Sequence, residues 1–170
     1  FQRAIGIAVD VAGNVYVSDD GRPEIQVFDN DGTFLRKFGS RGTGDGQFQH
    51  PTGIAVDAAG NVYVSDYETK RVQKFDAEGN FLLGWGMAVN ATGTPEGIGI
   101  DADGRLYITD YDRGRVEIFT PDGEFITSWE GGDNGRFARP VAIAFDSEGN
   151  VYVSNQAGNS VRKFAPPPLP

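Results

Sequence analysis

Histidine and cysteine are the side chains that most often transfer protons or hold metals at neutral pH, and this sequence is poor in both. His50 is the single histidine, and there is no cysteine. An imidazole could act as a general base or as one metal ligand. One histidine cannot make a multi-histidine zinc site, and thiolate sites and disulfides require cysteine. We therefore interpret His50 as a solvated loop residue and predict no catalytic residue, no metal and no cofactor.

Carboxylates recur in short turn sequences. Asp101-Ala102-Asp103-Gly104 is similar to the start of a calcium loop, but the alternating ligand oxygens and the closing glutamate do not follow after Gly104. An aspartate that opens a turn accepts backbone N–H groups, and a closing glycine supplies the positive φ. We therefore assign a structural turn role to the equivalent aspartates Asp10, Asp57, Asp101 and Asp146.

Two acid–base pairs have the same five-residue spacing. Asp66 precedes Arg71, and Asp110 precedes Arg115, across the connection between two predicted strands. We interpret each pair as a clasp that closes this connection. The last unit has Asn155 at the aspartate position and Ser160 at the arginine position, so it lacks both charges. Exposed pairs of this kind contribute only about 0–1 kcal/mol.

The overall charge limits the classes of partner. The chain has 170 residues and a formal net charge of −9. This excess of acid disfavours a general electrostatic grip on nucleic acid or on anionic lipid. No apolar run approaches the roughly 20 residues that a membrane-spanning helix needs. We expect a soluble chain that does not contact a membrane directly.

The strongest pattern is an internal repeat. GIAVDVAGNVYVSD begins at Gly6, GIAVDAAGNVYVSD at Gly53, GIGIDADGRLYITD at Gly97 and AIAFDSEGNVYVSN at Ala142. The equivalent aspartates are 47, 44 and 45 residues apart. Alternation with period two indicates half-buried strands. The remaining strands are predicted at 14–18, 72–75, 116–119, 33–38, 80–85 and 124–129, which makes four short antiparallel strands in each unit.

These units resemble the NHL repeat, through the GIAVD, GNVYVSD, RVQKFD and GNFL segments and the GTGDGQFQHP linker from Gly42 to Pro51. The resemblance covers nearly the whole chain and implies an all-β fold of four β-propeller blades. The expected propeller segment is 1–165, with blades at approximately 4–48, 51–94, 95–138 and 140–165, followed by a proline-rich tail at 166–170. Trp85 and Trp129 end equivalent outer strands, like Phe38, and are expected to pack between blades.

Both ends of the sequence indicate an incomplete propeller. The chain starts inside a connection between blades, and the fourth unit has no predicted outer strand after Phe164. We expect the chain to be part of a longer protein. Three arrangements stay open: a larger propeller with about two more blades, closure with a second chain, or a closed ring of four blades.

The connections that differ between units are the candidate binding residues. In proteins with this fold they gather on one face around the channel mouth. The candidates on this loop face are Arg22, His50, Tyr67, Glu68, Tyr111, Asp112, Arg113 and Gln156. Tyrosine and arginine are enriched at binding hot spots.

The resemblance implies a non-catalytic binding or scaffolding module that recognises a protein partner through the loop face and the blade ends. Self-association through open blade ends would be a further consequence. Two alternatives stay open: a fragment of a propeller lyase or lactonase whose catalytic groups lie outside this chain, and an RNA-binding domain. The compartment is undefined, with an extracellular, periplasmic or surface-exposed location favoured. Asn90-Ala91-Thr92 fits a glycosylation acceptor, a short motif that carries little weight alone.

Overall fold

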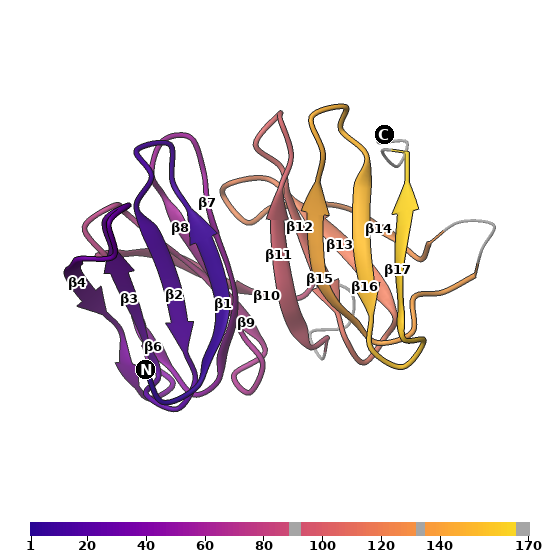
Figure 1. The fold of residues 1–170 in the computed structure, drawn as a ribbon. Coiled ribbons are helices and arrows are strands. Elements are labelled where there is room, and N and C mark those ends of the chain that lie inside the picture. The colour runs from indigo at the N-terminus through magenta and orange to yellow at the C-terminus, as the bar shows by residue number, and fades with distance from the viewer. Residues whose placement is uncertain (89–92, 132–134, 166–170) are drawn as a thin grey trace.

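The computed structural model describes residues 1–88, 93–131 and 135–165, and all its regular elements are β-strands (Figure 1). The all-β expectation is confirmed. Four antiparallel sheets, one for each repeat, follow one another along the chain. No helix in the described ranges could cross a membrane. The Asn90-Ala91-Thr92 motif and the proline-rich tail at 166–170 lie outside the described residues.

The first three sheets have four strands each. The first holds β1 (Ala4–Val9), β2 (Val15–Asp19), β3 (Glu24–Phe28) and β4 (Phe34–Phe38). The second holds β7 (Pro51–Val56), β8 (Val62–Asp66), β9 (Arg71–Phe75) and β10 (Phe81–Gly86), and the third holds β11 (Pro95–Ile100), β12 (Leu106–Asp110), β13 (Arg115–Phe119) and β14 (Phe125–Trp129). The predicted strands agree with these bounds to within one residue.

The fourth sheet has three described strands, β15 (Pro140–Phe145), β16 (Val151–Asn155) and β17 (Ser160–Phe164). The linker after the first sheet also forms a short parallel pair, β5 (Ser40–Arg41) with β6 (Gln47–Phe48), which the sequence pattern did not predict. The pattern has no signal for it because two-residue strands show no alternation.

The turn between the first two strands of each sheet depends on its aspartate. The Asp10 carboxylate accepts the backbone N–H groups of Ala12 at 2.9 Å and Asn14 at 2.8 Å. Gly13 closes the turn with φ 88°, a conformation that favours glycine. Equivalent hydrogen bonds surround Asp57, Asp101 and Asp146. These carboxylates are therefore engaged by their own turns.

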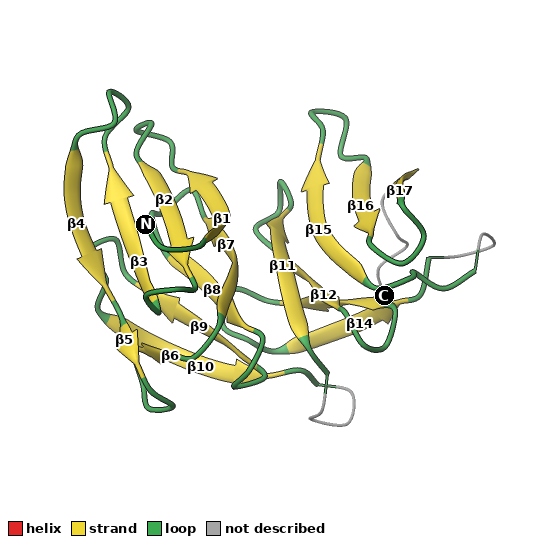
Figure 2. Cartoon of the chain, turned by 60° about the horizontal axis from the view of Figure 1, so that its bottom comes forward, coloured by secondary structure: helices red, strands yellow, loops and turns green. Residues whose placement is uncertain are grey.

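The four sheets stack face to face as the blades of a propeller. The inner strands β1, β7, β11 and β15 pack in that order, and Figure 2 shows β1 and β15 at the two ends of the resulting arc. Ile7 on β1 is 69% exposed, whereas the equivalent Ile54, Ile98 and Ile143 are 5%, 7% and 8% exposed. In blades 2, 3 and 4 the preceding blade covers this isoleucine. No preceding blade covers the same face of blade 1, so Ile7 is exposed.

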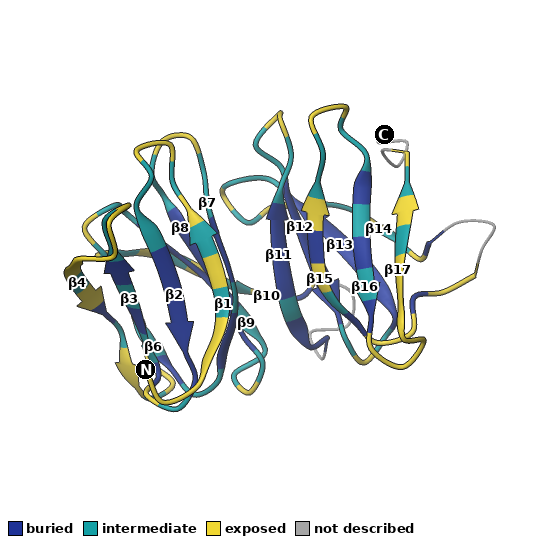
Figure 3. Ribbon diagram, viewed as in Figure 1, coloured by how far each residue is buried: buried dark blue, intermediate teal, exposed yellow. Residues whose placement is uncertain are grey.

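The core lies between the blades rather than inside any one of them. Figure 3 shows that the middle strands are buried and that β1 and β17 carry exposed residues. Trp85 of blade 2 packs against Phe119 of blade 3, with ring centroids 6.1 Å apart, and covers Gly123 there. Trp129 of blade 3 lies 4.6 Å from Phe164 of blade 4 in the same way. The expected packing of these aromatic residues between blades is confirmed.

Candidate functional site

A cavity of about 280 Å³ opens on the face where the connections between blades meet the inner strands. We call it the connection cavity. All four blades contribute to it. Its lining residues are Arg3, Ile5, Asp20, His50, Thr52, Tyr67, Glu96, Tyr111, Val141 and Gln156.

The cavity is built from equivalent positions of the repeat. Asp20, Tyr67, Tyr111 and Gln156 each follow the last residue of a second strand. The backbone N–H of each donates to the connection that enters the same blade, with Tyr67 bound to the carbonyl oxygen of His50 at 3.0 Å. Ile5, Thr52, Glu96 and Val141 occupy one equivalent position near the start of each inner strand. The repeat therefore fixes the backbone and leaves the side chains free to differ.

The aspartate that ends each second strand holds this framework. The Asp66 carboxylate accepts the N–H groups of Gln49 at 2.6 Å and Glu68 at 3.0 Å, so it ties the entering connection to the loop that leaves the strand. Asp19 does the same with Gln2 and Gly21. These buried carboxylates satisfy backbone donors that would otherwise be costly to bury.

His50 has a buried carboxylate as its partner. Asp20 is 3% exposed, and its Oδ1 lies 3.2 Å from Nδ1 of His50. Nε2 of His50 is 3.0 Å from Nη2 of Arg3, which also pairs with Asp20. A guanidinium can only donate, so Nε2 is the acceptor and Nδ1 carries the proton that faces Asp20. The imidazole therefore lies in the wall of the cavity, and its side chain is 43% exposed to solvent.

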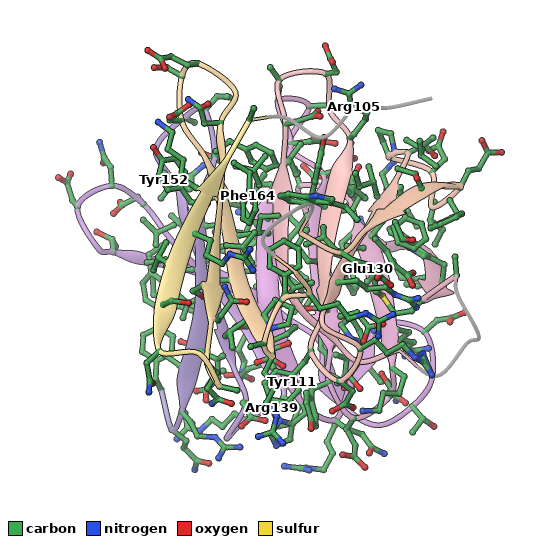
Figure 4. The ribbon with its side chains drawn as sticks, turned by 90° about the vertical axis from the view of Figure 1, so that its right-hand side faces the viewer. Arg105, Tyr111, Glu130, Arg139, Tyr152 and Phe164 are labelled. Carbon is green, nitrogen blue, oxygen red and sulfur yellow. The ribbon has the colours of Figure 1, made fainter. Side chains whose placement is uncertain are left out.

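A row of aromatic rings continues from His50. The His50 and Tyr67 ring centroids are 6.0 Å apart, and Tyr67 meets Tyr111 edge to face at 6.1 Å. Lys70 Nζ lies 4.3 Å from the Tyr67 centroid, and Arg139 lies 5.5 Å from that of Tyr111 (Figure 4). Burial, followed by the nearby Asp112 charge, raises the pKa of Tyr67 above its usual value. The Tyr67 hydroxyl is therefore neutral at physiological pH, and both rings carry a cation on their faces.

Glu96 lines two cavities. It borders the connection cavity and also a second space of about 250 Å³, which we call the inner-strand cavity because residues of β1, β7, β11 and β15 line it. The Glu96 backbone carbonyl is held by Ser65 Oγ at 2.5 Å and Thr52 Oγ1 at 3.1 Å. Burial raises the pKa of the Glu96 carboxyl to about 7, although the charge of Lys70 opposes the shift.

The predicted binding residues divide into two groups. His50, Tyr67, Tyr111 and Gln156 come together in the connection cavity. Asp112 does not line the cavity, and its Oδ2 accepts a hydrogen bond from Thr94 Oγ1 at 2.5 Å. The remaining three, Arg22, Glu68 and Arg113, do not line the cavity.

Sequence reasoning missed Arg3, Asp20 and Glu96. A signal was present, because Glu96 carries a charge at a position where the other units have Ile5, Thr52 and Val141. Comparison of the units position by position would have identified it.

The two predicted clasps differ from each other. Arg115 Nη2 lies 3.3 Å from Asp110 and 2.6 Å from Glu117. Arg71 instead turns away from Asp66 and donates to the carbonyl oxygen of Gln47 at 3.0 Å. Backbone N–H groups occupy both carboxylate oxygens of Asp66, whereas those on Asp110 bind Oδ1 and leave Oδ2 facing Arg115. The predicted Asp66–Arg71 ion pair is therefore replaced by contacts with the preceding linker.

The comparisons with known proteins agree with this architecture. A family model described as NHL repeat matches residues 48–75 and 92–119. A search of curated proteins gave no match.

Solved structures match over nearly the whole chain. A streptogramin B lyase structure has a TM-score of 0.73 and 15% identity, over 98% of this chain and 55% of that chain. A catalytically inactive virginiamycin B lyase from Staphylococcus aureus with quinupristin has a TM-score of 0.74 and 14% identity, over 99% of this chain and 57% of that chain. Kuenenia stuttgartiensis hydrazine synthase has a TM-score of 0.73 and 16% identity, over 96% of this chain and 46% of that chain. The chain thus spans little more than half of each lyase, and identities this low show the fold alone.

Proposed function

Because this chain carries NHL repeats on the blades of a β-propeller, we propose that it is a non-catalytic recognition module whose connection cavity binds a protein partner. One observation carries the proposal. The backbone is repeated closely from blade to blade, yet equivalent positions that face the cavity carry different side chains. One position holds Asp20, Tyr67, Tyr111 and Gln156, and another holds Ile5, Thr52, Glu96 and Val141. Such a framework positions diverse groups rigidly, which lowers the entropic cost of binding.

The composition and size of the cavity support a protein segment as the ligand. Tyr67 and Tyr111 offer large contact area with few rotatable bonds, and Gln156 and His50 add polar groups that define orientation. A volume of about 280 Å³ is at or below the lower limit for pockets that enclose a drug-sized molecule, roughly 300 Å³. The cavity therefore fits one or two side chains of a larger partner.

Peptide selection tests this proposal. A phage-displayed library of random peptides is selected against the chain, and the enriched peptides are synthesised and titrated by calorimetry. We expect the double variant Tyr67→Ala with Tyr111→Ala to weaken binding at least about tenfold, a loss of about 1.4 kcal/mol. Val11→Ala, at an exposed turn residue outside the cavity, is the matched control. Failure to enrich any peptide, or equal binding by the double variant, would refute the proposal.

A lyase is the second candidate, and His50 is the observation that favours it. An imidazole whose Nδ1 faces a buried carboxylate has the orientation of a general base, and Asp20 supplies that carboxylate at 3.2 Å. Arg3 occupies Nε2, the nitrogen that would take a proton from a substrate. Incubation with quinupristin, followed by mass spectrometry, separates the two functions. If quinupristin is cleaved, and if His50→Ala abolishes the cleavage, the function is catalysis and not recognition.

A further inference from the structure

Glu96 stands apart from the other charged residues of the connection cavity. Asp20 is paired with Arg3 and His50, so its charge is compensated within the protein. In the described part of the chain, no ion pair within 4.0 Å involves the Glu96 carboxylate. Lys70 is the nearby cation, and its Nζ donates to Thr94 Oγ1 at 2.9 Å.

The surroundings of Glu96 disfavour its own charge. The position is occupied by Ile5, Thr52 and Val141 in the other blades, and these uncharged residues form the walls around it. A half-buried carboxylate loses hydration that apolar walls cannot replace. The raised pKa of Glu96, about 7, is the consequence. A cation placed beside this carboxylate would restore the lost stabilisation.

The space next to Glu96 has the shape and polarity for the rest of such a cation. The inner-strand cavity continues from Glu96 along apolar residues, among them Ile7, Ile54, Ile98 and Ile143. Tyr67 and Tyr111 form the rim on the other side. An alkyl chain with a terminal positive charge can bury its methylenes against such walls. The net charge of −9 also attracts a basic segment from a distance.

We infer that Glu96 is a cation-binding subsite that receives a lysine or arginine side chain from the protein partner. The inference rests on the proposed function, since it names the group that the partner inserts. The ammonium or guanidinium pairs with the Glu96 carboxylate, and the apolar stem lies between the inner strands.

Small probes test this subsite without the partner. The chain is titrated with n-butylammonium and with n-butanol, and carboxyl and amide resonances are followed by NMR. We expect saturable shifts at Glu96 and Gly97 with n-butylammonium, at least about tenfold weaker binding of n-butanol, and a fall in the pKa of Glu96 when the cation is bound. Equal binding of the two probes would overturn the inference.

Matched variants separate the subsite from general acidity. Glu96→Gln keeps the shape of the side chain and should abolish the preference for the cation. Glu78→Gln removes the same charge from an exposed residue that lines neither cavity, and it should leave the preference unchanged. Thermal unfolding of both variants checks that each is folded. An equal loss in the two variants would show that only net charge is sensed, and the inference would fail.

The outcome also distinguishes this inference from the proposed function. Selected peptides that bind through Tyr67 and Tyr111, but contain no basic residue and are insensitive to Glu96→Gln, would refute the subsite and support recognition. Specific binding of n-butylammonium at Glu96, without any selected peptide, would support the subsite and refute the protein partner.

Discussion

A hydroxyl at one equivalent position of the second strand links each blade to the next. Ser65 Oγ accepts the N–H of Gly53 at 2.8 Å and donates to the carbonyl oxygen of Glu96 in the following blade at 2.5 Å. Ser18 and Thr109 make the same bridge from the first and third blades. Ser154, the equivalent residue of the last blade, accepts the N–H of Ala142 at 3.0 Å. The bridge thus occurs wherever two blades meet.

Ser65→Ala should therefore destabilise the chain more than the same change in the last blade. It leaves the half-buried Gly53 N–H without this acceptor and the Glu96 carbonyl oxygen with Thr52 Oγ1 alone, which costs about 1–3 kcal/mol of the free energy of unfolding. Ser154→Ala removes an exposed hydrogen bond and should cost less than about 0.5 kcal/mol. Urea denaturation measures both. Equal losses would mean that the hydroxyl does not stabilise the contact between blades.

The candidate site could be predicted from the sequence only in part. His50, Tyr67, Tyr111 and Gln156 were identified because connections vary where strands repeat. Glu96 was missed because it lies on a strand, and strand alternation says nothing about where neighbouring blades leave a space. Asp20 was missed because its partner His50 is 30 residues away, in the next connection. Such pairings are properties of the assembled blades.

The outer hairpin turns of the first two blades are also held by aspartates, Asp29 and Asp76. Asp76 Oδ1 accepts the N–H groups of Glu78 at 3.0 Å and Asn80 at 2.8 Å, and Oδ2 accepts from the Asn80 side chain. These hydrogen bonds, the side-chain one of Asn80 first, lower the pKa of Asp76 below its usual value. The Asp-x-x-Gly sequence predicted the turn, because both its hydrogen bonds and its positive φ are local.

The stabilisation from this turn should be lost in acid. The folded-state pKa of Asp76 lies below its unfolded value near 3.8, so the contribution is complete above that value and disappears as the pH falls through the folded-state pKa. Asp76→Asn should reduce the decrease in urea midpoint between about pH 5 and about pH 2, since an amide does not titrate there. Asp31→Asn, at an exposed turn residue, is the control. An unchanged decrease in Asp76→Asn would contradict this role.

The propeller fold could be predicted because four similar repeats are present in the sequence. Whether the free faces of blades 1 and 4 can pack against another blade could not be predicted. Inner strands approach so closely that a Cβ on Gly6, Gly53 or Gly97 would overlap a carbonyl oxygen of the next blade. Blade 4 has Ala142 at this position, and it is exposed. The single methyl group therefore obstructs any further blade that would stack on β15 in the same register.

This obstruction bears on the proposed self-association through blade ends. Stacking of blade 4 on blade 1 of a second copy would cover the exposed Ile7, and the Ser154 hydroxyl would face the carbonyl oxygen of Ile5, as Ser65 faces that of Glu96. The hydrophobic gain favours such a dimer, but the Ala142 methyl would meet the same carbonyl oxygen. End-to-end association in this register should therefore be weak in the natural sequence.

Ala142→Gly should strengthen end-to-end association, because it restores the glycine found at all three existing contacts between blades. We expect the dissociation constant for dimers, measured by sedimentation velocity, to fall at least about tenfold. Adding Ser154→Ala to this variant should reverse most of the gain, since the bridging hydroxyl is then absent. Ala157→Gly, at an exposed loop residue of the same blade, should have no effect. If Ala142→Gly stays as monomeric as the natural sequence, the free faces of blades 1 and 4 are not complementary, and self-association through the blade ends is refuted.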